Sequence, residues 1–218
     1  GDDPEDVEIN KERIAGAIGV HKEDFTYTHQ THTTNVARVM PEDKGRHFME
    51  TDGLVTNVPG ICLVTFYADC VPLFFVDPVK KAIGLSHSGW RGTVGKMGKV
   101  TVEKLVKEFG SDPKDILAAI GPSICQDCYE VSEDVIERFK EAFDASLWEE
   151  LFYKKENGKY QLNLWRANEA VFEEAGILKE HMAVTNLCTH CNPDLLFSHR
   201  TTGNARGNLS AFLALQEV

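Results

Sequence analysis

Two histidines and one cysteine lie at the ends of apolar segments of this chain. His32 belongs to the polar segment HQTHTTN, Cys70 ends the run YADC, and His87 follows the apolar run KAIGLS. Because the ends of strands meet at the edges of sheets, these three side chains could converge on one point. Two imidazoles and a thiolate suit zinc, and three protein ligands leave a fourth position for water or substrate. Their separations of 38 and 17 residues match no local metal motif, so spacing alone supports only a hypothesis.

The segment around His87 reads GLSHSGWRGTVGKMG and passes from an apolar strand to the start of a helix. It does not fit the phosphate-binding P-loop, because five residues separate Gly89 from Gly95 and Met97 follows the lysine. It also lacks the final glycine of the G-x-S-x-G nucleophile turn. The free N–H groups of the following helix would favour an anion near Arg91. Alternatively, His87 only satisfies a local hydrogen bond.

Four further cysteines form two CxxC elements, Cys125–Cys128 and Cys188–Cys191. Two such elements indicate a zinc ribbon when about 15–20 residues separate them. Here Cys188 lies 60 positions after Cys128, with a predicted helical region between them. We therefore interpret these cysteines mainly as small apolar residues in turns. A structural metal site that joins the pairs through the fold is the alternative.

Strands and helices alternate along the chain, which predicts one mixed α/β domain with a mixed sheet flanked by helices. The segments with apolar and β-branched character predict strands at 25–29, 36–40, 60–67, 72–77, 81–87, 116–122, 181–187 and 196–200. The segments with helical periodicity predict helices over 6–17, from about 94 to 109, 132–143 and 163–175. No internal repeat or linker divides the chain.

Composition excludes several classes of protein. A formal net charge of −11 argues against non-specific binding of nucleic acid, which requires lysine and arginine against phosphates. The longest apolar runs are far shorter than the roughly 20 residues that cross a bilayer, so no membrane partner is expected. No signal peptide is visible at the acidic start of the sequence, and the dispersed cysteines favour reduced thiols. These features predict a cytoplasmic protein.

Six ordered motifs give the sequence a specific resemblance. They are HQTHTTNV, DGLVTN, YADCVPLFF, GLSHSGWRGTVGKM, AAIGPSICQDCYEV and FSHR. Together they resemble the laccase-domain family, which was once regarded as multicopper polyphenol oxidases. The family was later recognised to contain purine nucleoside phosphorylases and a peptidoglycan editing factor. The resemblance extends over nearly all of residues 1–218, which we expect to form a single domain of this family.

The resemblance implies a zinc site. In the family, zinc is held by the histidine of Q-x-H, the cysteine of A-D-C and the histidine of H-[SA]-G-W-R-G, which correspond here to His32, Cys70 and His87. It argues against metal binding by the CxxC pairs, since Cys125 and Cys128 fall in a stretch with a structural role. Two departures stand out. Members usually carry strands before the G-D-D motif, so the N-terminal part of the family domain is expected to be missing. Many members also have tyrosine directly before the late arginine, where this chain has His199.

The resemblance further implies phosphorolysis of adenosine, inosine or methylthioadenosine, with adenosine deamination as a side activity. Phosphorolysis needs groups that hold an anion in line and stabilise the departing purine. Arg46, Arg91 and Arg200 are candidate contacts to phosphate or purine, although each could be a solvated surface arginine. Asp69, next to Cys70, is a candidate catalytic residue that could orient a histidine or accept a proton, or merely cap a turn. Gln30 is expected to help orient the site.

Three other functions compete with this one. Within the family, the same zinc-bound water could hydrolyse an amide during peptidoglycan precursor editing. A copper polyphenol oxidase would need more closely clustered histidines than the eight scattered here. A non-catalytic zinc-binding module is disfavoured because structural zinc usually has four protein ligands. The sequence does not distinguish a monomer from a homodimer.

Overall fold

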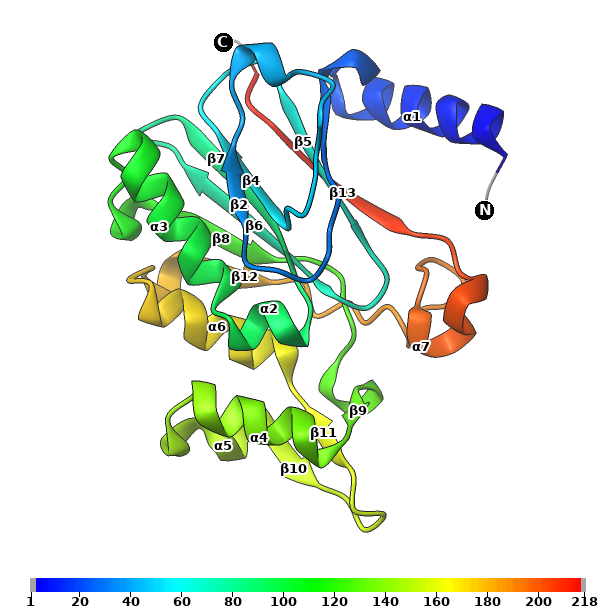
Figure 1. Ribbon diagram of the computed structural model, residues 1–218, viewed down its shortest axis with the longest axis vertical. Helices are drawn as coiled ribbons and strands as arrows, with labels where there is room; N and C mark the ends of the chain where they lie inside the picture. The colour runs from blue at the N-terminus through cyan, green and yellow to red at the C-terminus, as the bar shows by residue number, and fades with distance from the viewer. Residues whose placement is uncertain (1–2, 217–218) are drawn as a thin grey trace.

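The computed structural model describes residues 3–216, in which two stacked sheets form the centre of the molecule (Figure 1). The larger sheet has six strands in the order β12-β8-β6-β7-β4-β2. Its strands are β2 (Val36–Arg38), β4 (Gly53–Thr56), β6 (Val71–Asp77), β7 (Ala82–Ser88), β8 (Leu117–Ile120) and β12 (Met182–Val184). The four inner strands β8, β6, β7 and β4 pair antiparallel with one another, whereas the two edge strands pair parallel to their neighbours.

The second sheet has four strands in the order β13-β5-β1-β3. Its strands are β1 (Phe25–Thr28), β3 (His47–Phe48), β5 (Cys62–Tyr67) and β13 (Leu209–Ala214). Leu63 of this sheet packs with Leu54 and Leu85 of the six-stranded sheet in one buried cluster. Val64, on the opposite face of β5, packs with Ala15 of the N-terminal helix in a second buried cluster. Both faces of β5 are therefore covered, which explains why its sequence is mostly apolar rather than alternating.

Helices cover the outer faces of both sheets (Figure 1). The helices are α1 (Pro4–Ile18), α2 (Trp90–Val94), α3 (Met97–Phe109), α4 (Glu133–Ala142), α5 (Trp148–Leu151), α6 (Leu164–Glu174) and α7 (His199–Thr202). Helix α3 buries Met97, Val102 and Leu105, and Gly110 ends it with a left-handed φ of 69°. That apolar face packs in the main core with α6 and the six-stranded sheet, which fixes the direction of the chain leaving β7.

A small third sheet lies beside α4 and α5 (Figure 1). It consists of β9 (Glu130–Val131), β10 (Phe152–Lys154) and β11 (Tyr160–Leu162), all antiparallel. Val131, Phe139 and Leu162 bury their side chains in the main core, so this unit is continuous with the rest of the molecule.

The predicted fold class is confirmed: the chain forms one mixed α/β domain with mixed sheets and flanking helices. The strand predicted at 196–200 is wrong, because Ser198 Oγ accepts the Thr201 N–H at 3.2 Å and begins helix α7 instead. Strand β13, which the sequence analysis did not predict, pairs with β5 along Leu209–Ala214. Within residues 3–216, no helix has both the length and the apolar character needed to cross a membrane.

Candidate active site

The structure brings His32, Cys70 and His87 together. His32 lies in the loop after β1, Cys70 directly precedes β6, and His87 is near the end of β7, just before α2. Strands β6 and β7 pair so that Pro72 lies opposite His87, which brings Cys70 to the same end of the two strands as this histidine. One potential ligand atom from each of the three residues lies within 4.8 Å of the other two. These residues therefore supply two imidazoles and one thiol to a single point.

A buried carboxylate that the sequence analysis did not single out organises this point. Asp52 is fully buried just before β4 and accepts a hydrogen bond from His87 Nδ1 at 2.9 Å. It also accepts the backbone N–H groups of Thr31, His32 and Thr33 at 2.9–3.1 Å and the Thr33 hydroxyl at 2.8 Å. One side chain thus fixes both the loop that carries His32 and the ring of His87.

The same contacts set the charge of Asp52. Burial raises the pKa of its carboxyl, but the hydrogen bonds from His87 and Thr33 outweigh burial and lower it to about 2. An ionised carboxylate can only accept hydrogen bonds, so Nδ1 of His87 carries a proton and Nε2 is left to face the ligand point. A carboxylate that orients a histidine in this way is typical of metal sites.

Cys70 has the character of a thiolate ligand. Burial raises the pKa of this thiol, but hydrogen bonds and charge from His32 and His87 lower it to about 6. For His87, burial lowers the pKa, and the contacts with Asp52 and Cys70 raise it to about 9. The backbone makes room for the three ligands at Gly89, where a Cβ would lie 3.0 Å from Cys70 Sγ and 3.2 Å from His32 Cδ2.

A cavity of about 660 Å³ opens over the three ligands, a volume within the range of small-molecule sites. Its lining consists of Thr28, His29, Gln30, His32, His47, Phe66, Ala68, Asp69, Cys70, His87, Tyr129, His199, Arg200, Arg206 and Asn208. Aromatic rings and cationic side chains thus share one cavity with the ligand point. A smaller hollow of about 360 Å³ adjoins it at Tyr129 and Arg200.

Asp69 and Gln30 reach this cavity, but their polar groups are engaged elsewhere. Asp69 accepts the Thr189 hydroxyl and the Arg200 backbone N–H, both at 2.7 Å, so Asp52 rather than Asp69 orients the histidine. The Gln30 amide donates to the Phe66 carbonyl and accepts the Phe66 N–H, both at 2.7 Å. Both residues hold backbone in place around the cavity.

The three candidate arginines separate. Arg200 lines the cavity, lies over the Tyr129 ring at 5.3 Å and donates to the Glu130 carbonyl at 2.9 Å. Arg91 is exposed outside the cavity lining and stacks over Trp90 at the start of α2. Arg46 also lies outside the lining, where it pairs with Asp43 at 2.7 Å.

Several cavity residues escaped the sequence analysis, among them the polar residues Arg206 and Asn208. They lie just before β13, which the analysis did not predict, and therefore no strand end pointed to them. Arg206 donates to His199 Nδ1 at 3.4 Å and to the Gly207 carbonyl at 3.3 Å. With Arg200, it gives the cavity lining two guanidinium groups.

The two CxxC pairs, which we interpreted from the sequence mainly as small apolar residues in turns, lie together in the structure, as the alternative of a site that joins them through the fold requires. The sulfur atoms of Cys125, Cys128, Cys188 and Cys191 lie within 4.8 Å of one another, despite the long separation in sequence. The reason is that the segment after β8 runs beside the segment after β12, two strands that pair in the six-stranded sheet.

Comparisons with known proteins find relatives that match most of this chain. Residues 1–216 match the family model described as multi-copper polyphenol oxidoreductase laccase. A relative from Bacillus subtilis (strain 168), named purine nucleoside phosphorylase YlmD, is 35% identical over 98% of this chain and 78% of its own length. A protein from an unknown prokaryotic organism, named adenosine deaminase RL5, is 36% identical over 93% of this chain and 79% of its own length.

A solved structure resembles the whole described fold. The crystal structure of YlmD from Geobacillus stearothermophilus superimposes with a TM-score of 0.94 at 32% identity, covering 100% of this chain and 83% of that one. Because the family model spans almost the entire sequence and the relatives exceed 30% identity over most of it, the assignment does not depend on single motifs. The chain belongs to the multi-copper polyphenol oxidoreductase laccase family, the laccase-domain family that its motifs resemble.

Proposed function

We propose that this protein is a zinc-dependent purine nucleoside phosphorylase with adenosine deaminase activity at the same site. The observation that carries the proposal is the placement of His32, Cys70 and His87 at one point on the wall of a cavity of about 660 Å³. Relatives named purine nucleoside phosphorylase and adenosine deaminase support the choice of reaction. The proposed substrates are adenosine, inosine or methylthioadenosine, together with phosphate.

The donor set fits zinc. Two imidazole nitrogens and a thiolate are ligands that zinc prefers, and three protein ligands leave a position open toward the cavity. Bound there, zinc would supply a Lewis acid and could lower the pKa of a coordinated water. Asp52 supports this role because its bond to His87 Nδ1 leaves Nε2 as the ligand atom. Asp52 also holds the backbone of His32 through the N–H at 3.0 Å.

In phosphorolysis, a phosphate oxygen bonds to the anomeric carbon while the bond from that carbon to the purine nitrogen breaks. The electron pair of the broken bond leaves with the base, so the protein must hold an anion and a planar ring at once. Arg200 and Arg206 supply positive charge to the cavity, and Phe66 and Tyr129 supply aromatic rings to its lining. Burial raises the pKa of Tyr129 well above 10, so its hydroxyl stays neutral and can donate a hydrogen bond.

Asp69 is proposed as a positioning residue in this mechanism. Its carboxylate accepts the backbone N–H of Arg200 at 2.7 Å and the hydroxyl of Thr189 at 2.7 Å. It therefore holds the start of α7, which carries the cationic side chain, against the segment that carries Cys70. Arg91, outside the cavity, is proposed only as a contributor to the positive potential near Tyr129.

The test is incubation of purified protein with adenosine, inosine or methylthioadenosine, with and without phosphate. Free base and ribose 1-phosphate, or the methylthio analogue of that sugar phosphate, should form only when phosphate is present. Inosine formed from adenosine without phosphate would report deamination. Metal analysis of wild type and Cys70→Ala should show loss of one zinc and of both activities together. Absence of turnover with every nucleoside, or turnover that persists in Cys70→Ala, would overturn the proposal, and cleavage of a muramyl peptide precursor instead would indicate editing.

A further inference from the structure

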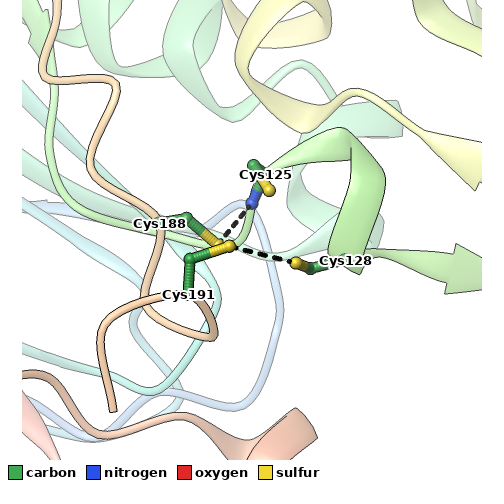
Figure 2. A group of neighbouring side chains, drawn as sticks. All are labelled: Cys125, Cys128, Cys188 and Cys191. Carbon is green, nitrogen blue, oxygen red and sulfur yellow. Dashed lines mark hydrogen bonds between the residues drawn. The ribbon is translucent and has the colours of Figure 1, made fainter. Parts of the chain in front are cut away.

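A second cluster of metal-binding side chains lies outside the cavity lining (Figure 2). Cys125 and Cys128 come from the segment after β8, and Cys188 and Cys191 from the segment after β12. All four thiols are free, and the sulfur atoms of Cys128 and Cys191 are 3.4 Å apart. Figure 2 shows the side chains from the two segments pointing toward one another.

The backbone holds the two segments in register. Ser123 N–H donates to the Leu187 carbonyl at 3.2 Å, and Thr189 N–H donates to the Ser123 carbonyl at 3.2 Å. These bonds form a parallel bridge between Ser123 and Cys188. Within the cluster, the Cys125 N–H donates to Cys188 Sγ at 3.3 Å. An amide that donates to a sulfur stabilises negative charge on it, as a metal-bound thiolate requires.

The sulfurs lie close enough together to form a tetrahedral metal site after small adjustments. A zinc–sulfur bond of about 2.3 Å places the sulfurs of a tetrahedral site with four cysteine ligands about 3.8 Å apart. The four sulfurs here are all within 4.8 Å of one another, so side-chain adjustments of about an ångström or less would form the site. Each half also has the C-x2-C spacing common in structural zinc sites.

We propose that these four cysteines bind a structural zinc ion, distinct from the metal of the cavity. Four protein ligands close the coordination shell, which is the mark of a structural rather than a catalytic zinc. Pairing into disulfides is the competing chemistry for convergent thiols. One zinc ion accounts for the position of all four cysteines, whereas disulfides would need two separate bonds, Cys128–Cys191 and Cys125–Cys188. In the structure all four thiols are free, and Cys188 Sγ accepts the Cys125 N–H.

The position of the cluster says what the ion would stabilise. Tyr129 directly follows Cys128 and lines the cavity, and Thr189 directly follows Cys188 and donates to the Asp69 carboxylate. The Ile124 N–H also donates to the Asp69 carbonyl at 3.0 Å. Zinc at the four cysteines would thus bind both segments that brace the chain immediately before Cys70. It would hold this wall of the cavity without contacting substrate.

The test measures metal in a variant that lacks the first site. Cys70→Ala removes a cavity ligand and keeps the four cysteines, so protein purified with reductant and zinc should retain one zinc per chain. Adding Cys128→Ser and Cys191→Ser should remove that ion, whereas adding Cys62→Ser, a buried thiol outside both clusters, should not. Cobalt substituted into Cys70→Ala should give the intense visible and charge-transfer bands of a tetrahedral cobalt thiolate.

A second measurement covers the case in which the serine variants do not fold. In zinc-loaded Cys70→Ala, a thiol reagent should modify four fewer cysteines than after treatment with a strong chelator, and the chelator should lower Tm. Cys70→Ala that carries no zinc, or that carries iron in its place, would overturn the proposal. Two disulfides detected by mass spectrometry in protein prepared under the same reducing conditions would also overturn it. None of these outcomes depends on the nucleoside reaction, so this proposal and the proposed function can fail separately.

Discussion

Asp52→Asn tests whether one buried carboxylate organises the active site. Oδ1 of Asp52 accepts hydrogen bonds from His32 N–H and His87 Nδ1, and Oδ2 accepts those of Thr31 and Thr33. Asparagine has a single acceptor oxygen, so its NH2 group must face at least two N–H donors in either orientation. If it faces His87, the ring must move its proton to Nε2 and loses the ligand atom that points to Cys70.

The expected magnitudes follow from these contacts. Each buried donor left without an acceptor costs about 1–3 kcal/mol, so we expect a loss of roughly 3 kcal/mol in the free energy of unfolding. For a domain of this size that loss lowers Tm by roughly 6–12 °C. Loss of the carboxylate behind a metal-bound histidine typically weakens metal affinity by about 10–100-fold. Phosphorolysis should fall in proportion to zinc occupancy and recover in part when zinc is added.

The assay is retention of zinc against increasing chelator, with Cys70→Ala as the reference for the four-cysteine cluster. Asp77→Asn is the matched control, because Asp77 is also fully buried but accepts the Val79 and Lys80 N–H groups at the opposite end of β6. The length of that strand places it about 20 Å from Cys70. Unchanged zinc affinity in Asp52→Asn, or an equal loss in Asp77→Asn, would refute the role assigned to Asp52.

Three further results are expected. Gly89→Ala should weaken zinc binding at the cavity in the same chelator assay, because the added Cβ would press on Cys70 Sγ. Gly16→Ala is the control: its Cβ would meet open space, so zinc binding should not change. In steady-state kinetics, Arg200→Gln should raise the KM for phosphate by about 10-fold, because one charge-assisted contact is lost. Arg46→Gln should leave that KM within about twofold, because Arg46 lies outside the cavity lining. Equal effects of the two substitutions would contradict this placement of the arginines. In metal-free wild type, the depressed pKa of Asp52 contributes about 2 kcal/mol of stability. This contribution is fully present above about pH 4, the pKa of an aspartate in the unfolded chain. It is lost as the pH falls through about 2, the pKa of Asp52 in the folded protein. The free energies of unfolding of metal-free wild type and Asp52→Asn, measured with urea, should therefore differ by about 2 kcal/mol less in acid than at neutral pH. Parallel pH profiles of the two free energies would contradict this role of Asp52.

The strand ends could be predicted because local sequence determines them. Apolar runs such as 60–67 and 81–87 must be buried, and the polar residues that follow them mark where the backbone leaves the sheet. Cys70 and His87 were therefore placed at a sheet edge from the sequence. The order of the strands was not predicted, because it depends on contacts between distant segments. That Cys70 and His87 lie together at the ends of the paired strands β6 and β7 could therefore only be hypothesised.

Asp52 and the CxxC cluster show what local sequence does not contain. Asp52 stands one residue before β4, where an aspartate commonly ends a turn, and nothing nearby reveals that residues 31–33 fold over it. The two CxxC elements meet because β8 and β12 pair in parallel, although the paired residues Ile120 and Val184 are far apart in the sequence. The intervening helices α4 and α6 lie outside the sheet and leave that pairing intact. Sequence separation therefore carried no information about the distance between these cysteines.

Histidine content alone is a poor guide to the metal in this fold. Five of the eight histidines line the cavity, so they are not scattered in space as they are in sequence. Yet within residues 3–216 only His32 and His87 share a ligand point, with Cys70. His47 instead stacks on Tyr27 at 4.4 Å, and His199 accepts a hydrogen bond from Arg206. Two histidines and a cysteine could also hold a single copper ion, as in electron-transfer sites with a weak axial ligand. Such a site works by shielding its metal, whereas this ligand point opens onto a cavity large enough for a nucleoside. The open face therefore argues against an electron-transfer copper site and fits the Lewis-acid metal that we propose.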